Sequence, residues 1–240
     1  MDTIPCHFND VNMIAHRGLS GIETENTLPA FVAAANRSYY GIETDVHVTR
    51  DGRFILHHDD STARLADSDL ILEETDYDTL RALPLKWQGE YSTRPDLRMP
   101  SLAEYITVCK IYGKKAVLEL KNRIQPDKIR EITEIIRELG HFEDTIFISF
   151  YMENLIDLRT IAPDAVAQFL TSNPITDEML DTLKTYRLDM DAKYTLLTRE
   201  LVDKMHGFGM TVNCWTCDVK EDAEALRALG VDQITSNILE

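Results

Sequence analysis

The sequence predicts an α/β fold of the TIM (β/α)8 barrel type, with a small insertion after the second strand. About eight short apolar runs alternate with segments of helical periodicity, which is the pattern of parallel strands joined by helices. Polar side chains follow several of these runs at their C-terminal ends, where barrel enzymes have their active sites. An open doubly wound sheet is the alternative, but no Gly-x-Gly-x-x-Gly loop follows the first run.

The length and composition fit one barrel. The 240 residues are 44% hydrophobic, which is enough for one large core, and no internal linker rich in Pro, Gly or Ser divides them. We therefore expect a single domain over residues 1–240, with an inserted loop region at about 60–99. These features make no prediction of oligomeric state.

The net charge limits the partners of the protein. The chain has 41 acidic residues against 25 Lys plus Arg, a formal net charge of -16, which repels nucleic acid and anionic membranes at long range. We expect no nucleic-acid partner and no stable membrane association. A small anionic substrate is compatible with this charge, because a bound metal ion and a few cations reverse the field locally.

The sequence shows no targeting signal. Residues 1–18 contain no basic region followed by an apolar core, and no later run approaches the ~18 apolar residues of a membrane helix. The cysteines lack the density and spacing of a secreted disulfide framework. A cytoplasmic location is therefore predicted, with reduced thiols at Cys6, Cys109, Cys214 and Cys217.

The first strands and helix follow from local patterns. Val11–Ala15 is a short apolar run, and Asn26 or Thr27 then offers the cap of a helix with apolar residues at helical spacing. The alternating segment Ile42–Val48 predicts a second strand, and after a tight turn the residues Phe54–Leu56 return as another extended piece.

Residues 60–99 interrupt this alternation of strand and helix patterns. They are rich in Asp, Glu, Ser, Thr and Arg and contain only a short helical pattern near residues 78–83. We expect them to form an insertion that covers one mouth of the fold. Ser101 and Glu104 then have the spacing of a capping box, which predicts the start of the next helix.

The rest of the chain alternates regularly. Glu240 follows the last predicted strand too closely for a closing helix, so the pattern does not predict what covers that strand. Strands are predicted at residues 116–120, 145–150, 165–170, 188–190, 210–215 and 233–235, and helices at 126–139, 153–161, 177–185, 199–206 and 219–229.

Three acidic residues at predicted strand ends are candidate ligands of one divalent cation. Glu43 and Asp45 project from the same face of a strand because side chains alternate along it, and Glu119 ends another strand. Hard cations such as Mg²⁺ or Ca²⁺ prefer carboxylate oxygens. The alternative is that each acid forms an ordinary ion pair, but the three together favour the metal.

Two histidines near strand ends are candidates for general acid and base. His16 and His58 have a side chain that titrates near neutral pH and can both accept and donate a proton. His57 lies beside His58, and only one of two neighbours on a strand faces inward, so the pattern leaves the choice between them open.

Arg17 and Lys121 place positive charge beside the proposed metal. Three carboxylates on one divalent ion leave a net negative charge, and these two cations reverse its sign locally, which suits a singly charged phosphodiester. The alternative is that Arg17 and Lys121 only pair with the acids.

The spacing Cys214-x-x-Cys217 continues an apolar strand and has no second Cys or His pair nearby. A structural role is therefore favoured over a redox or zinc site. Trp215, at the end of this strand, is expected to line the mouth as an apolar wall for the part of the substrate that does not react.

An ordered set of short motifs resembles the glycerophosphodiester phosphodiesterase family over roughly residues 14–237. The resemblance rests on Ala15-His16-Arg17-Gly18, Glu25-Asn26-Thr27 with Ala30-Phe31, Ile42-Glu43-Thr44-Asp45-Val46, Thr49-Arg50-Asp51-Gly52, His58-Asp59, Pro100-Ser101-Leu102-Ala103-Glu104, Leu118-Glu119-Leu120-Lys121, Ser149-Phe150 and Trp215-Thr216.

The resemblance implies a TIM barrel that hydrolyses glycerophosphodiesters to sn-glycerol 3-phosphate and an alcohol, with Ca²⁺ or Mg²⁺. It selects His58 over His57. Carried over by position, it implies His16 and His58 as the acid/base pair, Glu43, Asp45 and Glu119 as metal ligands, and Arg17 and Lys121 at the phosphate.

One departure from the family pattern is visible. The family usually has Thr-Asp-x-Pro after the last strand, where this chain has Thr235-Ser236-Asn237-Ile238, so the resemblance assigns no role to this loop in recognising glycerol or the alcohol. Two other functions are alternatives: a related barrel phosphodiesterase acting on lysophospholipids, and a non-catalytic barrel that binds a phosphorylated ligand. The polar insertion argues against the first, and the full set of acids and histidines argues against the second.

Overall fold

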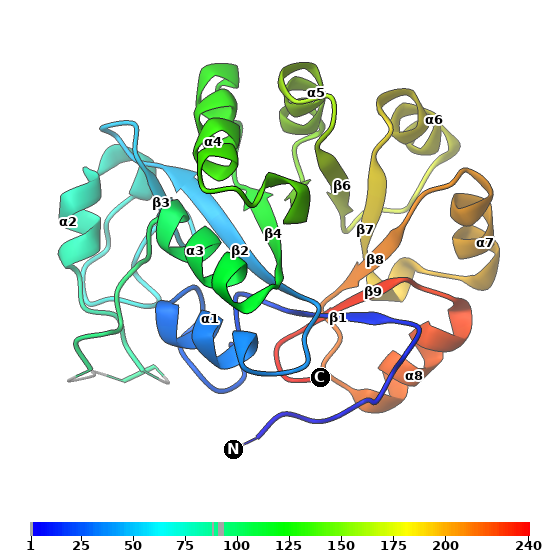
Figure 1. The fold of residues 1–240 in the computed structure, drawn as a ribbon, viewed down its shortest axis with the longest axis horizontal. Helices are drawn as coiled ribbons and strands as arrows, with labels where there is room; N and C mark the ends of the chain where they lie inside the picture. Colours follow the sequence, from blue (N-terminus) through cyan, green and yellow to red (C-terminus); the bar gives the residue numbers. More distant parts are fainter. Residues whose placement is uncertain (1, 88, 91–93) are drawn as a thin grey trace.

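The structure, a computed structural model, describes residues 2–87, 89–90 and 94–240. Eight parallel strands form a closed ring with helices outside it (Figure 1). The ring order is β1-β9-β8-β7-β6-β5-β4-β2, and β2 pairs with β1 to close it. The predicted barrel is confirmed, and the alternative prediction of an open doubly wound sheet is wrong. The ring strands are β1 (Asn12–Ala15), β2 (Gly41–Val48), β4 (Lys115–Leu120), β5 (Thr145–Ser149), β6 (Val166–Thr171), β7 (Asp189–Lys193), β8 (Val212–Trp215) and β9 (Gln233–Ser236).

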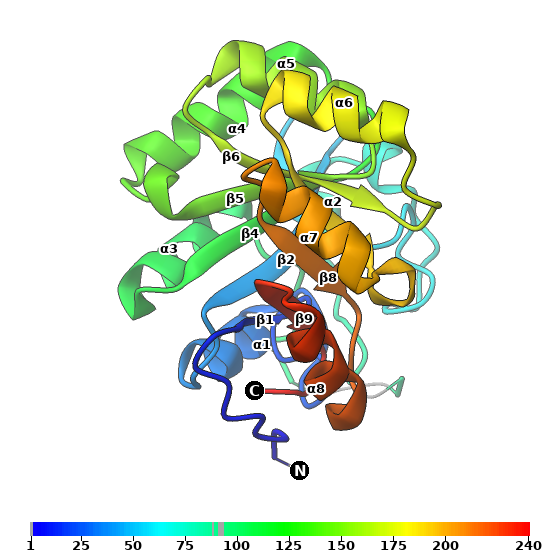
Figure 2. The same cartoon turned by 90° about the vertical axis from the view of Figure 1, so that its right-hand side faces the viewer.

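Each crossover between consecutive ring strands includes a helix on the outside of the barrel (Figure 2). Thr27 is the cap of the first helix, where its hydroxyl accepts a hydrogen bond from the backbone N of Ala30. The capping box of Ser101 and Glu104 is present as predicted. The helices are α1 (Leu28–Ala35), α3 (Leu102–Tyr112), α4 (Pro126–Glu138), α5 (Met152–Ile161), α6 (Asp177–Tyr186), α7 (Arg199–Gly207) and α8 (Lys220–Leu229), with short 3-10 turns at Phe142–Asp144 and Tyr194–Leu196.

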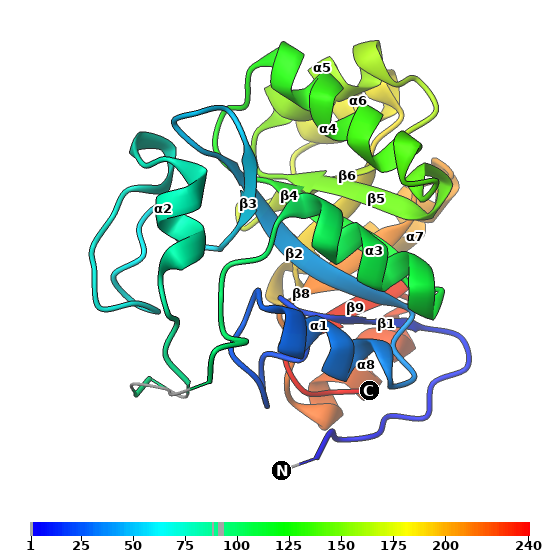
Figure 3. The same cartoon turned by 60° about the vertical axis from the view of Figure 1, so that its left-hand side comes forward.

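The insertion is more ordered than the sequence suggests. It begins after β3 (Phe54–Leu56), which pairs antiparallel with β2, and contains a 3-10 turn (Leu72–Glu74) and α2 (Tyr77–Ala82) beyond the C-terminal end of β2 (Figure 3). Residues 88 and 91–93 of the predicted insertion lie outside the described part of the chain. A small apolar cluster stabilises the described part of the insertion. Its buried members include Ile55, Leu65, Leu72, Leu80, Leu85, Leu97 and Met99. The assignment of all 240 residues to one domain stays a prediction.

The N-terminal segment lies against the residues that follow β9. Ile4 forms a parallel bridge with Leu239, and the backbone N of Cys6 donates to the carbonyl oxygen of Glu240 at 2.6 Å. Leu239 is fully buried in the main core. The sequence pattern, which did not predict what covers the last strand, gave no indication of this pairing.

The cysteines, all within the described residues, are buried free thiols. Cys214 and Cys217 each direct the sulfur to a different backbone carbonyl, that of Gln233 and that of Val219 respectively. The structural reading of this pair therefore agrees with the contacts. No helix among the described residues has both the length and the apolar character needed to cross a membrane.

The loop after β1 packs tightly against α1 at Gly18. This residue has a φ of +75°, in the left-handed region, and a Cβ atom here would lie 2.7 Å from the carbonyl carbon of Ala30. Gly113 has a similar φ of +64°, but a Cβ atom there would meet nothing within 4 Å. A comparison of substitutions at Gly18 and Gly113 therefore distinguishes the effect of backbone strain, which is present at both positions, from the effect of close packing, which is present only at Gly18.

We expect Gly18→Ala to lower the free energy of unfolding by roughly 1–3 kcal/mol more than Gly113→Ala, because both substitutions strain the backbone but only the first also forces a clash. Urea unfolding of the two variants measures the difference. Equal losses in the two variants would show that the packing of the loop against α1 contributes nothing.

Candidate active site

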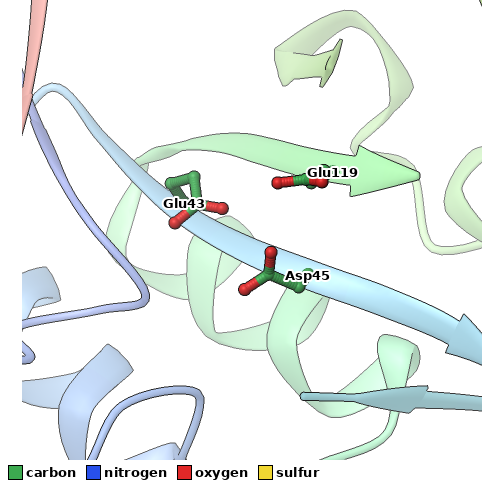
Figure 4. A group of neighbouring side chains, drawn as sticks. All are labelled: Glu43, Asp45 and Glu119. Carbon is green, nitrogen blue, oxygen red and sulfur yellow. The ribbon is translucent and has the colours of Figure 1, made fainter. Parts of the chain in front are cut away.

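Three buried carboxyl groups lie together inside the barrel. Asp45 on β2 is in register with Glu119 on β4, and Glu43 lies two residues earlier on the same face of β2 (Figure 4). One carboxylate oxygen from each lies within 4.8 Å of the others. The residues are only 3%, 1% and 7% exposed for Glu43, Asp45 and Glu119. The sequence expectation that these acids meet agrees with this geometry.

Two cations contact this acidic cluster. Lys121 Nζ lies 3.0 Å from Glu119 Oε1 and 3.5 Å from Asp45 Oδ1. The backbone N of Arg17 donates to Glu43 Oε2 at 2.7 Å, and its Nε lies 3.9 Å from Asp45 Oδ2. Arg17 and Lys121 thus do pair with the acids, as one of the two sequence interpretations held.

The carboxyl groups differ in how readily they ionise. Burial and the negative charge of Asp45 raise the pKa of Glu119 to about 8 and hold the pKa of Glu43 well above its usual value. Burial also opposes ionisation of Asp45, but the charges of Lys121 and Arg17 outweigh it and hold this pKa below its usual range. Lys121 and Arg17 therefore stabilise the ionised form of Asp45 more than the ionised forms of Glu43 and Glu119.

These residues fit a divalent cation. All the donors are oxygen atoms, which hard cations prefer, and among the residues that the structure describes Asp45 Oδ1 has no hydrogen-bond partner, only the ion-pair contact with Lys121. An added positive charge would favour the ionised forms of Glu43 and Glu119.

His16, directly after β1, is oriented by the loop after β9. Asn237 donates through Nδ2 to Asp218 Oδ2 at 2.6 Å, so its Oδ1 faces His16 Nδ1 at 2.7 Å. An oxygen can only accept, so Nδ1 of His16 bears the proton and Nε2 keeps its lone pair. Burial, aided by the charge of Arg17, lowers the pKa of His16 to about 4.

His58 has a charged partner instead. Its Nδ1 lies 2.7 Å from Asp59 Oδ1, and Arg64 donates from Nε to Asp59 Oδ2 at 2.6 Å. Burial lowers the pKa of His58, while the charge of Asp45 and the hydrogen bond to Asp59 oppose this. Arg64 also donates to Glu25, which pairs with Arg17, so this network links both sides of the site.

His57 takes no part in this arrangement. It is fully buried, and its Nε2 lies 3.2 Å from the backbone oxygen of Ser61. Of the two neighbours, His58 is the one that lines the cavity described next.

An inner cavity of about 50 Å³ lies at the centre of the site. Trp215 and Phe150 meet there edge to face, with ring centroids 5.4 Å apart, so Trp215 forms part of an apolar wall of the cavity. Of the three acids predicted as metal ligands, Glu43 and Glu119 line this cavity and Asp45 does not. The inner cavity is lined by His16, Arg17, Glu43, His58, Glu119, Ile148, Phe150, Leu170, Asp191, Trp215 and Thr235.

An outer groove of about 450 Å³ adjoins the inner cavity, and the two share His58, Glu119 and Phe150. Lys121 lines the groove rather than the inner cavity. The outer groove is lined by His58, Asp59, Asp60, Glu119, Lys121, Asn122, Phe150 and Tyr151.

Sequence reasoning missed three residues that contact or line the site. Asp59 was visible as the neighbour of His58, but nothing indicated that it contacts the imidazole. Asn237 stands in the loop that departs from the family pattern, and Asp191 lies just beyond the short strand predicted at 188–190.

These features define a class: (β/α)8-barrel proteins whose strand ends carry a group of buried acids that could hold a cation, beside two imidazoles. Residues 16–239 match the glycerophosphoryl diester phosphodiesterase family, and the chain belongs to this family. The resemblance noted in the sequence is therefore confirmed.

Relatives and solved structures agree with this assignment. A glycerophosphodiester phosphodiesterase of Caldanaerobacter subterraneus is 28% identical over 232 residues, which cover 94% of this chain and 93% of that protein. The structure of a glycerophosphodiester phosphodiesterase from Parabacteroides distasonis has 25% identity and a TM-score of 0.78, covering 95% of this chain and 93% of that one. An Oleispira antarctica phosphodiesterase, solved in complex with the product sn-glycerol-3-phosphate, shares the fold with a TM-score of 0.84 at 23% identity, covering 98% of this chain and 96% of that one.

Replacing Asn237 by Asp should raise the pKa of His16 from its value of about 4, because a carboxylate beside Nδ1 favours the charged imidazolium. NMR titration of the histidines in metal-free protein measures this shift. Asn237→Leu, which removes the acceptor without adding charge, should produce no rise. An unchanged pKa in Asn237→Asp would contradict the contact between residues 16 and 237.

Proposed function

We propose that the protein hydrolyses glycerophosphodiesters, such as glycerophosphocholine or glycerophosphoethanolamine, to sn-glycerol 3-phosphate and an alcohol. The observation that carries this proposal is a group of three buried carboxyl groups, two of which line one small cavity together with two imidazoles, in a chain of this family. The product bound to the Oleispira antarctica relative supports the same substrate class.

Glu43, Asp45 and Glu119 would hold one divalent cation, Ca²⁺ or Mg²⁺. When bound, such an ion supplies a Lewis acid that neutralises charge on a phosphoryl oxygen. The remaining chemistry falls to the side chains of the chain.

Arg17 and Lys121 would bind the phosphate group. Arg17 lines the inner cavity and Lys121 the adjoining groove, so their charges lie on two sides of the space beside the acids. There they stabilise the negative charge that grows as phosphorus becomes five-coordinate.

His16 would act as the general base. Its partner Asn237 is uncharged and holds the proton on Nδ1, so the free lone pair on Nε2 is available to accept a proton. The proton comes either from water or from the adjacent hydroxyl of the substrate, and detection of a cyclic 1,2-phosphate by phosphorus NMR distinguishes the two routes.

His58 would act as the general acid. The carboxylate of Asp59 stabilises its protonated form, whereas His16 has only an amide. His58 also lines both the inner cavity and the outer groove, through which a leaving alcohol can depart, whereas His16 lines the inner cavity alone.

Lysophospholipid hydrolysis is disfavoured by the lining of the outer groove. Apart from Phe150 and Tyr151, the residues that line this groove are polar or charged, which suits an acyl chain poorly.

The protein should release glycerol 3-phosphate from glycerophosphocholine, and EDTA should abolish the release because the acids then lack their cation. His16→Ala should lower kcat by roughly 10²–10⁴-fold through loss of the base. His7→Ala, at an exposed histidine outside the site, is the matched control and should leave the rate unchanged. No release with added Ca²⁺, Mg²⁺ or Mn²⁺ would favour the non-catalytic binding barrel.

The two histidines should respond differently to the leaving group. His58→Ala should lower hydrolysis of glycerophosphocholine by roughly 10²–10⁴-fold but spare most of the activity on a p-nitrophenyl diester of glycerol phosphate, because nitrophenolate leaves without a proton. His16→Ala should impair both substrates alike. The reverse pattern in steady-state kinetics would exchange the two roles.

A further inference from the structure

Strand β7 places a carboxyl group in the site that the chemistry above does not use. Asp191 is 1% exposed and lines the inner cavity, and its buried Oδ1 has no hydrogen-bond partner within the described part of the chain. In the ring, β7 lies four strands from β2 in either direction. Asp191 therefore lies on the wall opposite Glu43 and Asp45.

The neighbours of Asp191 do not supply the missing partner. Leu170, in register on β6, is apolar. Asn213, in register on β8, donates its amide to Gln168 at 3.2 Å. Trp215 donates its Nε1 to the backbone oxygen of Asp191, at 3.3 Å, rather than to the carboxyl group. Because a buried polar group without a partner is costly, a ligand in the cavity is the natural partner.

The protonation of the Asp191 carboxyl group limits which ligand group can hydrogen-bond to it. Burial, aided by the charge of Glu119, raises the pKa of Asp191 well above its usual value, which favours the neutral carboxyl form that can both donate and accept a hydrogen bond. A hydroxyl group matches that pattern, since it also does both.

The size of the space points the same way. The inner cavity of about 50 Å³ has room for a few water molecules, so a hydroxymethyl group fits it. The edge-to-face rings of Phe150 and Trp215 provide apolar surface for the adjoining carbon atoms.

We propose that Asp191 is a specificity-determining residue that hydrogen-bonds the terminal hydroxyl of the glycerol moiety while Trp215 and Phe150 pack against its carbon atoms. The assignment rests on the proposed hydrolysis of glycerophosphodiesters. It places glycerol across the inner cavity from the acids and leaves the outer groove to the alcohol.

The test compares glycerophosphocholine with the choline diester of propane-1,2-diol phosphate, which keeps the hydroxyl next to the phosphoester and lacks only the terminal one. The unaltered protein should prefer glycerophosphocholine by about 100-fold in kcat/KM, because a site built to bind a hydroxyl rejects an analogue without it. Asp191→Leu should remove most of this preference by slowing glycerophosphocholine alone.

Two further variants separate recognition from folding. Asp191→Asn should retain most of the preference, because an amide also donates and accepts hydrogen bonds. Asp189→Asn is the matched control on the same strand, since Asp189 Oδ1 already accepts from the backbone N of Thr211 at 2.8 Å, and it should leave the preference unchanged.

Four results would overturn the assignment. An equal loss on both substrates in Asp191→Leu would mean a structural role, and a loss confined to glycerophosphoethanolamine would mean that the residue binds an ammonium group. Turnover by the unaltered protein without any preference would overturn the role of Asp191 alone, whereas no turnover of any diester would overturn the proposed function together with it.

Discussion

Glu43, Asp45 and Glu119 concentrate negative charge in a space from which water is largely excluded, where each ionised carboxylate raises the free energy of ionising the next. Arg17 and Lys121 offset part of this repulsion. Their positions after β1 and β4 follow from the barrel, because the C-terminal ends of parallel strands meet at one mouth. The same crowding that destabilises the fold would favour the binding of a cation.

The two imidazoles show how one fold gives the same side chain two characters. His16 meets the amide of Asn237, which fixes a tautomer without adding charge. His58 meets the carboxylate of Asp59, which favours a proton on the ring. Burial lowers the pKa of both, so the partner at Nδ1 is what separates them.

Much of the fold and the acid cluster could be predicted, because strands buried on both faces read as apolar runs and because the alternation along β2 places its acids on one face. The partnership of His16 with Asn237 could not, since it joins residues 221 positions apart and exists only in a closed ring. Asp191 was hidden because Asp189 and Asp191 break the apolar pattern of β7. The apolar cluster of the insertion was missed because its residues have no regular spacing.

The strand β1 has four residues and is the seam of the ring, pairing with β2 on one side and β9 on the other. During translation, the strands from β2 to β8 can leave the ribosome and pair while this seam stays open. The nascent chain gains the partner of His16 only when residues 233–237 emerge. Incomplete translation products that end before this point therefore lack the assembled centre, even though they contain all three acids and both histidines.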